Sequence, residues 1–244
     1  MENDMPALII HGHFYQPPRE NPWTGEVERE ISAAPFHDWN ERIHAECYAP
    51  NAAALVGATV VNNYAHISFN FGPTLLSWLE KHHPTTYQRI LLADRDSVRA
   101  HSGHGNAIAQ AYGHAILPLC NDRDRLTQVV WGLADFRHRF GREPESMWLP
   151  ETAANDATLD VLIEQGFRYV ILAPSQASRY RAVGTSTWTE VDHGSIDTSR
   201  AYSYFHRDGS GRSIALFFYD GPLARAIAFE KALTSSERLV RIIK

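Results

Sequence analysis

Residues 146–151 read Ser-Met-Trp-Leu-Pro-Glu, and this short apolar run ending in an acid decides the fold that the chain is expected to adopt. A helical pattern over residues 122–140 precedes it, with apolar side chains on one stripe and Gly141 at the end. A second helical pattern, closed by Gly166, and the apolar run Tyr169-Val170-Ile171-Leu172 follow it. This alternation of strands and helices predicts a largely parallel sheet or barrel in an α/β fold.

A second acid stands at a similar break in the chain. Asp220 ends the apolar run Ile214-Ala215-Leu216-Phe217-Phe218-Tyr219, and Gly221-Pro222 follows directly. Catalytic side chains gather at the carboxyl ends of strands in α/β barrels, and two acids delivered there can cleave a glycosidic bond. We therefore expect Glu151 to act as a nucleophile, and Asp220, buried under the preceding aromatic residues, to hold a proton for the leaving oxygen.

Each acid also has a purely structural explanation. Glu151 could favour the start of the helix that follows Asn155, because acids stabilise helix N-termini. Asp220 could be an ordinary turn residue beside Gly221.

Composition excludes some function classes. The chain has 244 residues, 44% hydrophobic and 21% charged, with a formal net charge of −5. No basic cluster is present, so a nucleic-acid surface is not expected. Cys47 and Cys120 are too few and too far apart for a disulfide framework or a zinc site, and we interpret them as buried thiols in a reducing compartment.

The N-terminus gives no sign of export or membrane insertion. Its first residues, Met1-Glu2-Asn3-Asp4, are acidic, and only the short apolar run Ala7–Ile10 follows. A secretory signal needs a basic start and a longer apolar core, and no stretch reaches the ~18 apolar residues of a membrane span. We expect a cytoplasmic protein without a membrane partner, and we interpret Ala7–Ile10 as the first buried strand.

Other elements follow from periodicity and from Gly and Pro signals. We expect a helix from Asp38 to about Val56, interrupted at Pro50. The remaining expected elements are extended segments at 58–61 and 66–71, helices starting at Pro73 and Pro84, a polar excursion over 176–199, and a hairpin of 202–206 with 213–219 around Asp208-Gly209.

Histidines form a third candidate group. His11 and His13 follow the expected first strand, and His104 and His114 lie in later loops. Several histidines near successive strand ends indicate either hydrogen bonding to sugar hydroxyls or metal ligation. If the strand continued through His11 and His13, we expect their side chains to point in different directions.

The last residues read as a helix that is cut short. Residues 236–244 carry Leu239, Val240, Ile242 and Ile243, which still need a surface to pack against. We expect a chain truncated before its C-terminal elements, with self-association or a missing C-terminal part covering this face.

Taken together, the motifs resemble those of glycoside hydrolase family 57. The run from His11 to Trp23 matches the opening of one branch of that family. Four of the five family motifs have counterparts, at His13–Pro17, His114–Leu119, Trp148–Glu151 and Phe218–Asp220. The fifth would lie beyond residue 244.

This resemblance implies a single domain over residues 1–244 with a distorted (β/α)7 barrel, incomplete at its C-terminus. It implies retaining chemistry on an α-glucan substrate, with no metal and no other cofactor. Glu151 matches the nucleophile and Asp220 the acid/base. The residues expected to bind substrate are His11, His13, Gln16, Trp23, His104, His114 and Trp148.

Three functions stay open at this point. The first is a retaining hydrolase or transglycosylase, since the two reactions share a covalent intermediate. The second is a metal-dependent carbohydrate hydrolase or deacetylase with zinc on His11 and His13. The third is a catalytically silent fragment that binds glucan.

Overall fold

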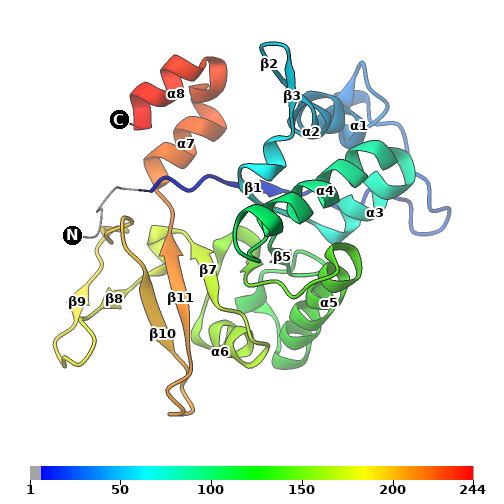
Figure 1. Ribbon diagram of the computed structural model, residues 1–244. Coiled ribbons are helices and arrows are strands. Elements are labelled where there is room, and N and C mark those ends of the chain that lie inside the picture. Colours follow the sequence, from blue (N-terminus) through cyan, green and yellow to red (C-terminus); the bar gives the residue numbers. More distant parts are fainter. Residues whose placement is uncertain (1–6, 244) are drawn as a thin grey trace. The chain divides into compact units, whose positions relative to one another are not determined.

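The computed structural model describes residues 7–243 and has a mixed α/β architecture (Figure 1). It divides into two compact units. The first unit comprises residues 7–115 and 126–148, and the second comprises residues 116–125 and 149–243. The acidic start, Met1 to Asp4, and the final residue, Lys244, lie outside the described residues.

Four parallel strands run through the first unit. Strand β1 (His11–Phe14) pairs with β4 (Ser68–Phe71), and β5 (Ala109–Gln110) pairs with β6 (Met147–Trp148). A parallel bridge between Phe69 and Ala107 joins the two pairs. The resulting order β1-β4-β5-β6 places the carboxyl ends of four strands along one edge, as the alternation of strands and helices predicted.

Helices follow or separate these strands. The helical segments of this unit are α1 (Trp39–Ile43), a π-helix (His44–Tyr48), α2 (Ala49–Ala52), α3 (Pro73–His82), α4 (Pro84–Ala100) and most of α5 (Asp122–Phe140). The π-helix continues directly into α2, so the helical backbone is not interrupted at Pro50 as expected. A short antiparallel hairpin, β2 (Ala54–Val56) with β3 (Thr59–Val61), follows α2.

Aromatic side chains fill the core of the first unit beneath β1 and β4. Phe14 stacks on Phe71 with ring centroids 4.7 Å apart, and Tyr64 meets both rings edge to face. The hydroxyl of Tyr64 donates to the carbonyl of Tyr48, so its buried polar atom is satisfied. This packing fixes β1 against β4 and thereby sets the positions of His11 and His13.

The second unit is built around a three-stranded sheet. Strand β7 (Tyr169–Leu172) pairs in parallel with β11 (Ser213–Phe218), and β10 (Tyr202–Phe205) pairs antiparallel with β11. The other elements are α6 (Asp156–Glu164), the hairpin β8 (Arg179–Tyr180) with β9 (Thr189–Glu190), α7 (Gly221–Phe229) and α8 (Ser236–Ile243). Helix α8 buries none of its described side chains, and Val240 and Ile242 are exposed.

Some expectations about local structure were wrong. Ala7–Ile10 is not a strand, since Leu8, Ile9 and Ile10 are exposed and the ladder with β4 begins only at His11. The helix expected to reach Val56 ends at Ala52. Cys47 and Cys120 are free, but they are half-buried rather than fully buried.

The prediction of an α/β fold is confirmed, and the (β/α)7 barrel stays a prediction. Apart from the single bridge between Phe69 and Ala107, the described residues form sheets of two or three strands, and this pairing does not show a closed barrel. No helix among residues 7–243 combines the length and the apolar character needed to cross a bilayer.

A buried ion pair ties three segments of the first unit together. Asp94 on α4 is 1% exposed and accepts two bonds from Arg142, at 2.7 and 2.9 Å. The same carboxylate accepts from the backbone N–H of Ala107, whose carbonyl accepts from Arg142. A Cβ at Gly105 would collide with both charged groups, which is why only glycine fits there. The charges are thus fully hydrogen-bonded, as burial requires.

We expect Arg142→Met to destabilise the protein by about 3–5 kcal/mol, because it leaves the Asp94 carboxylate buried and unpaired. Arg99→Met is the matched control, since the Arg99–Asp96 pair on the same helix is exposed and such pairs contribute about 0–1 kcal/mol. Urea unfolding of both variants measures the difference. Equal stability losses would contradict the role assigned to the buried pair.

Candidate functional site

Two histidines, a tryptophan and a third histidine form a stacked cluster in the first unit. His11 and His13 stack on the Trp148 indole, with ring centroids 5.0 and 4.6 Å away. His114 lies on the other side of His13, with Nε2 atoms 3.3 Å apart. Tyr15 stacks on His114 at 3.7 Å. We call these five residues the imidazole–indole cluster.

Strand geometry explains why His11 and His13 lie in the same cluster. Residues two apart on a strand point to the same face, and β1 runs through both histidines. The expectation that they would point in different directions was therefore wrong. Trp148 reaches the same place because it ends β6, while Gln110 beside it ends β5.

The buried side-chain amide of Asn70 connects two histidines of the cluster. Asn70 on β4 is 0% exposed, and its Oδ1 lies 3.1 Å from Nε2 of His11. Its Nδ2 donates to Oε1 of Gln110 at 2.6 Å and lies 3.0 Å from Nδ1 of His13. Two buried donors, Nε2 of Gln110 and Nε1 of Trp148, have no hydrogen-bond partner among the described residues.

The surroundings of the two strand histidines favour the neutral imidazole. Desolvation lowers the pKa of His11 from 6.5 to about 4, against an opposing hydrogen bond to Asn70. Desolvation likewise lowers the pKa of His13 to about 4, with smaller contributions from His114 and His11. The His13 side chain is solvent-exposed although aromatic rings flank it, so we expect the lowering to be clearer for the half-buried His11.

Three expected substrate residues lie outside these stacking and hydrogen-bond contacts. The Oε1 of Gln16 accepts a hydrogen bond from Arg19 at 2.8 Å. Trp23 is 92% exposed in the turn closed between Asn21 and Glu26. His104 is exposed and pairs with Glu145 at 2.9 Å. These contacts give Gln16 and His104 structural partners, and their substrate roles stay predictions.

Gln110 and Tyr15 were not identified from the sequence as parts of the candidate site. Gln110 lies in a short run of small residues, Ala109 to Ala111, and a single polar side chain in such a run is a signal that could have been used. Tyr15 lies in the run from His11 to Trp23, but it was not among the residues expected to bind substrate. Asn70 lies in the segment 66–71, which was expected to be extended, and the structure gives it the central hydrogen bonds.

Glu151 occupies a strained turn in the second unit. Its φ of 56° and ψ of 19° lie in the left-handed region, and the next residue, Thr152, has a φ of 53°. Left-handed backbone is uncommon for a glutamate and rarer still for a β-branched threonine. Each such residue costs about 1–3 kcal/mol, and strain of this kind clusters at functional sites. The Glu151 side chain is exposed.

Asp220 caps helix α7. Its Oδ1 accepts from the N–H of Leu223 at 2.8 Å, which is the bond of an N-cap residue. Phe218 is buried, but Asp220 itself is exposed. The burial expected under the preceding aromatic residues was therefore wrong: the strand ends at Phe218, and the chain turns outward into the helix.

A pocket of about 440 Å³ lies beside Asp220 in the second unit. Its lining comes from the segments after β7 and β11 and from the loop between β9 and β10: Ala173, Pro174, Ser175, His193, Gly194, Ile196, Thr198, Tyr219, Asp220, Gly221 and Pro222.

Hydrogen bonds connect the turn that carries Glu151 with this region. Ala154, three residues after Glu151, donates its N–H to Oε1 of Gln176 at 3.0 Å. Gln176 ends the short 3-10 helix that begins at Pro174, and Pro174 lines the pocket. Tyr219 donates its N–H to the carbonyl of Leu172 at the end of β7. Ala154, three residues after Glu151, and Tyr219, directly before Asp220, are therefore both bonded to the segment around the carboxyl end of β7.

We expect the free energy of unfolding to fall as the pH drops from 6.5 toward 4, because His11 must gain a proton that its folded environment disfavours. Because the pKa of His11 is lower in the folded state than in the unfolded state, the neutral His11 makes its full contribution to stability above pH 6.5. That contribution is lost as the pH falls toward 4. Asn in place of His11 should reduce the slope of stability against pH in this range by up to one proton. Urea unfolding at several pH values measures the slope, and an unchanged slope would contradict a neutral buried His11.

Several solved structures have a similar fold. The 4-alpha-glucanotransferase from Thermococcus litoralis aligns with a TM-score of 0.58 and 19% identity, over 95% of this chain and 30% of that one. An exo-type maltose-forming amylase from Pyrococcus sp. ST04 aligns with a TM-score of 0.59 and 14% identity, over 94% of this chain and 38% of that one.

A sequence relative and a family model add to this likeness. Alpha-amylase 1 from Dictyoglomus thermophilum is 29% identical over 107 residues, which are 43% of this chain and 15% of that protein. The chain thus spans well under half the length of these relatives. The model of glycosyl hydrolase family 57 matches residues 7–244, which is nearly the whole chain. The chain belongs to glycosyl hydrolase family 57.

Proposed function

We propose that this protein cleaves or transfers α-glucosidic bonds of a glucan, with Glu151 as the nucleophile and Asp220 as the acid/base. The observation that carries the proposal is the backbone of Glu151, held in the left-handed region on a turn bonded to the segment after β7. Strained backbone at an acid that matches the nucleophile motif supports a functional role for that acid. Family membership and the glucan-active names of the relatives support the substrate class.

The proposed reaction has two steps. The Glu151 carboxylate attacks the anomeric carbon, the bond to the leaving oxygen breaks, and Asp220 gives that oxygen a proton. Asp220 then takes a proton from water or from a sugar hydroxyl, whose oxygen attacks the anomeric carbon and releases Glu151. Water gives hydrolysis, and a sugar hydroxyl gives transglycosylation. We further propose that the strands form part of the (β/α)7 barrel expected for the family.

Sugar binding is the role that we propose for the imidazole–indole cluster. Flat rings with polar edges suit the apolar faces and hydroxyls of a sugar. Neutral imidazoles can donate and accept hydrogen bonds at the same time, which hydroxyl ligands require. The unpaired buried donors of Gln110 and Trp148 favour a polar ligand, because a buried N–H without a partner costs about 1–3 kcal/mol.

We expect Asp220→Asn to lower the rate on an α-glucan by about 10²–10⁴-fold, since asparagine keeps the helix cap but cannot transfer the proton. Glu151→Gln should abolish turnover while leaving the fold intact. Release of reducing sugar and formation of transfer products measure both effects.

Asn155→Ala is the matched control, because Asn155 caps α6 as Asp220 caps α7. It should lose about 1 kcal/mol of stability and keep its activity. Full activity in Asp220→Asn would contradict the acid/base assignment. If the wild type and Glu151→Gln are equally inactive while both bind glucan, the protein is a glucan-binding module and the proposed catalysis is wrong.

A further inference from the structure

A group of metal-binding side chains lies in the first unit and includes none of the residues proposed for catalysis or sugar binding. Glu41, His44 and His83 each offer one potential ligand atom, and these atoms lie within 4.8 Å of one another. We call them the Glu–His–His group. It is the one such group found among residues 7–243.

Backbone structure brings the three residues together. Glu41 and His44 are three residues apart, so they share one face of the helical segment formed by α1 and the π-helix. The π-helix begins at His44 itself, and π-helical turns are frequent at functional sites. His83 lies at the non-helical corner between α3 and α4, with a φ of −134°.

The group is already close to the size of a zinc site. Nε2 of His83 lies 3.0 and 3.1 Å from the two carboxylate oxygens of Glu41. Ligand atoms around a tetrahedral zinc ion are ~3.3 Å apart, given metal–ligand bonds of about 2.0–2.1 Å. The widest separation in the group, up to 4.8 Å, would close by about 1.5 Å on binding. Side-chain rotation alone can supply such a change.

Neighbouring residues contact both imidazoles. His44 Nε2 lies 2.9 Å from the hydroxyl of the buried Thr86, as a metal-binding histidine is often fixed through its second nitrogen. The His44 and His83 rings are stacked with centroids 3.5 Å apart, and the Trp78 ring lies 5.0 Å from His83. The bond to Thr86 holds His44, whereas the His83 ring must turn out of the stack on binding, because the in-plane nitrogen lone pairs of stacked rings do not meet at one ion.

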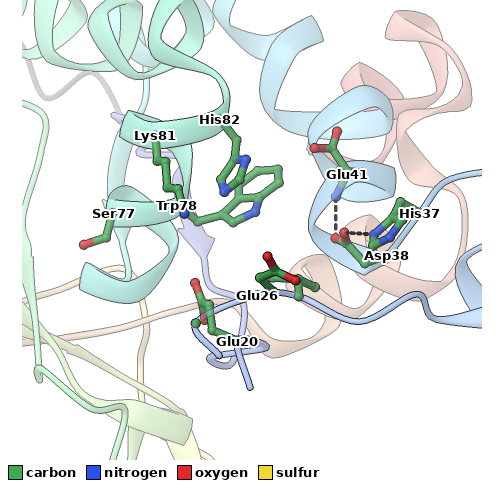
Figure 2. A pocket seen from close by; sticks show the side chains of 11 residues that line it. Glu20, Glu26, His37, Asp38, Glu41, Ser77, Trp78, Lys81 and His82 are labelled. Atoms are coloured by element: carbon green, nitrogen blue, oxygen red, sulfur yellow. Dashed lines mark hydrogen bonds and ion pairs between the residues drawn. The ribbon is translucent and has the colours of Figure 1, made fainter. Parts of the chain in front are cut away.

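An open, acidic pocket adjoins the group. Glu41 also lines a pocket of about 650 Å³ with Glu20, Glu26 and Asp38, opposite a single lysine, Lys81. Figure 2 shows Asp38 and Glu41 together at the start of α1 and Glu20 and Glu26 on another loop, with His82 on α3 across from Glu26. The pocket gives an ion an entry path with negative potential and leaves room for water to complete its coordination.

We propose that Glu41, His44 and His83 bind a divalent transition metal, best represented by Zn²⁺, as a clamp between the α1–π-helix segment and the α3–α4 corner. Two imidazoles and one carboxylate favour zinc and its neighbours over calcium or magnesium, which prefer oxygen ligands alone. The ion joins segments about 40 residues apart in sequence. It therefore stabilises the folded state by mass action.

The test uses untagged protein freed of metal by a chelator and then titrated with ZnCl₂ in a calorimeter. We expect one tight site per chain and a rise of several degrees in the thermal midpoint at saturating zinc. His83→Ala and His44→Ala should each weaken this site on the order of 100-fold. Co²⁺ in place of zinc should give the visible absorption bands of a low-coordinate site, and these bands should be lost in the same variants.

His82→Ala is the matched control, because His82 adjoins His83 in sequence and lines the pocket but is not in the group. It should bind zinc as the wild type does. Glu41→Gln, which keeps a hydrogen-bond partner for His83, guards against a misfolded alanine variant and should also bind weakly. The proposal fails if the wild type has no tight site, if His83→Ala retains it, or if His13→Ala removes it instead.

Discussion

The side-chain amide of Asn70 is the interaction on which the first unit's candidate site depends. It is fully buried between parallel strands, and it contacts His11, His13 and Gln110 at once. A buried amide must have its hydrogen bonds satisfied, so the register of β1 and β4 and the placement of Gln110 are tied to one another. A shift of β1 by one residue would turn both histidines to the opposite face, and a shift of β4 by one residue would turn Asn70 away from them.

The second unit places its acids by a different constraint. Parallel pairing of β7 with β11 makes the carboxyl ends of both strands face the same way, and the chain leaves β11 into a helix that Asp220 caps. The turn that carries Glu151 is strained, since Glu151 and Thr152 both have positive φ values, and backbone bonds from Thr152 to Leu149 and from Ala153 to Pro150 close it. Asp220 therefore stabilises α7 in addition to its proposed catalytic role, and the Glu151 turn costs stability. A variant that tests catalysis at Asp220 must keep the helix cap, as Asp220→Asn does.

Helix boundaries were predictable because their signals are local. Pro73 and Pro84 start helices, and Gly141 and Gly166 follow helix ends with φ values of 67° and 83°, as glycine allows. Strands were harder, because β5 and β6 have only two residues each and leave no periodic pattern. The apolar run Ala7–Ile10 is exposed, so hydrophobicity alone did not fix where pairing begins.

The candidate site residues were likewise predictable only where the signal is local in the sequence. The motifs placed Glu151 and Asp220 shortly after strands, but His13 lies within β1 and does not follow a strand as expected. The exposure of Asp220 depends on where the chain turns, which no local pattern reports. The Glu–His–His group was missed altogether. Glu41 and His83 are 42 residues apart and meet only through tertiary packing.

We propose that Glu151 forms a covalent bond to the sugar, and mass spectrometry can detect that bond. Asp220→Asn protein mixed with α-maltosyl fluoride should accumulate the intermediate, because fluoride leaves without an acid while the second step lacks its base. We expect a maltosyl group on the peptide that contains Glu151. This adduct should be absent when Glu151 is also replaced by Gln. An adduct on another residue, or turnover of the fluoride that survives Glu151→Gln, would contradict the proposal.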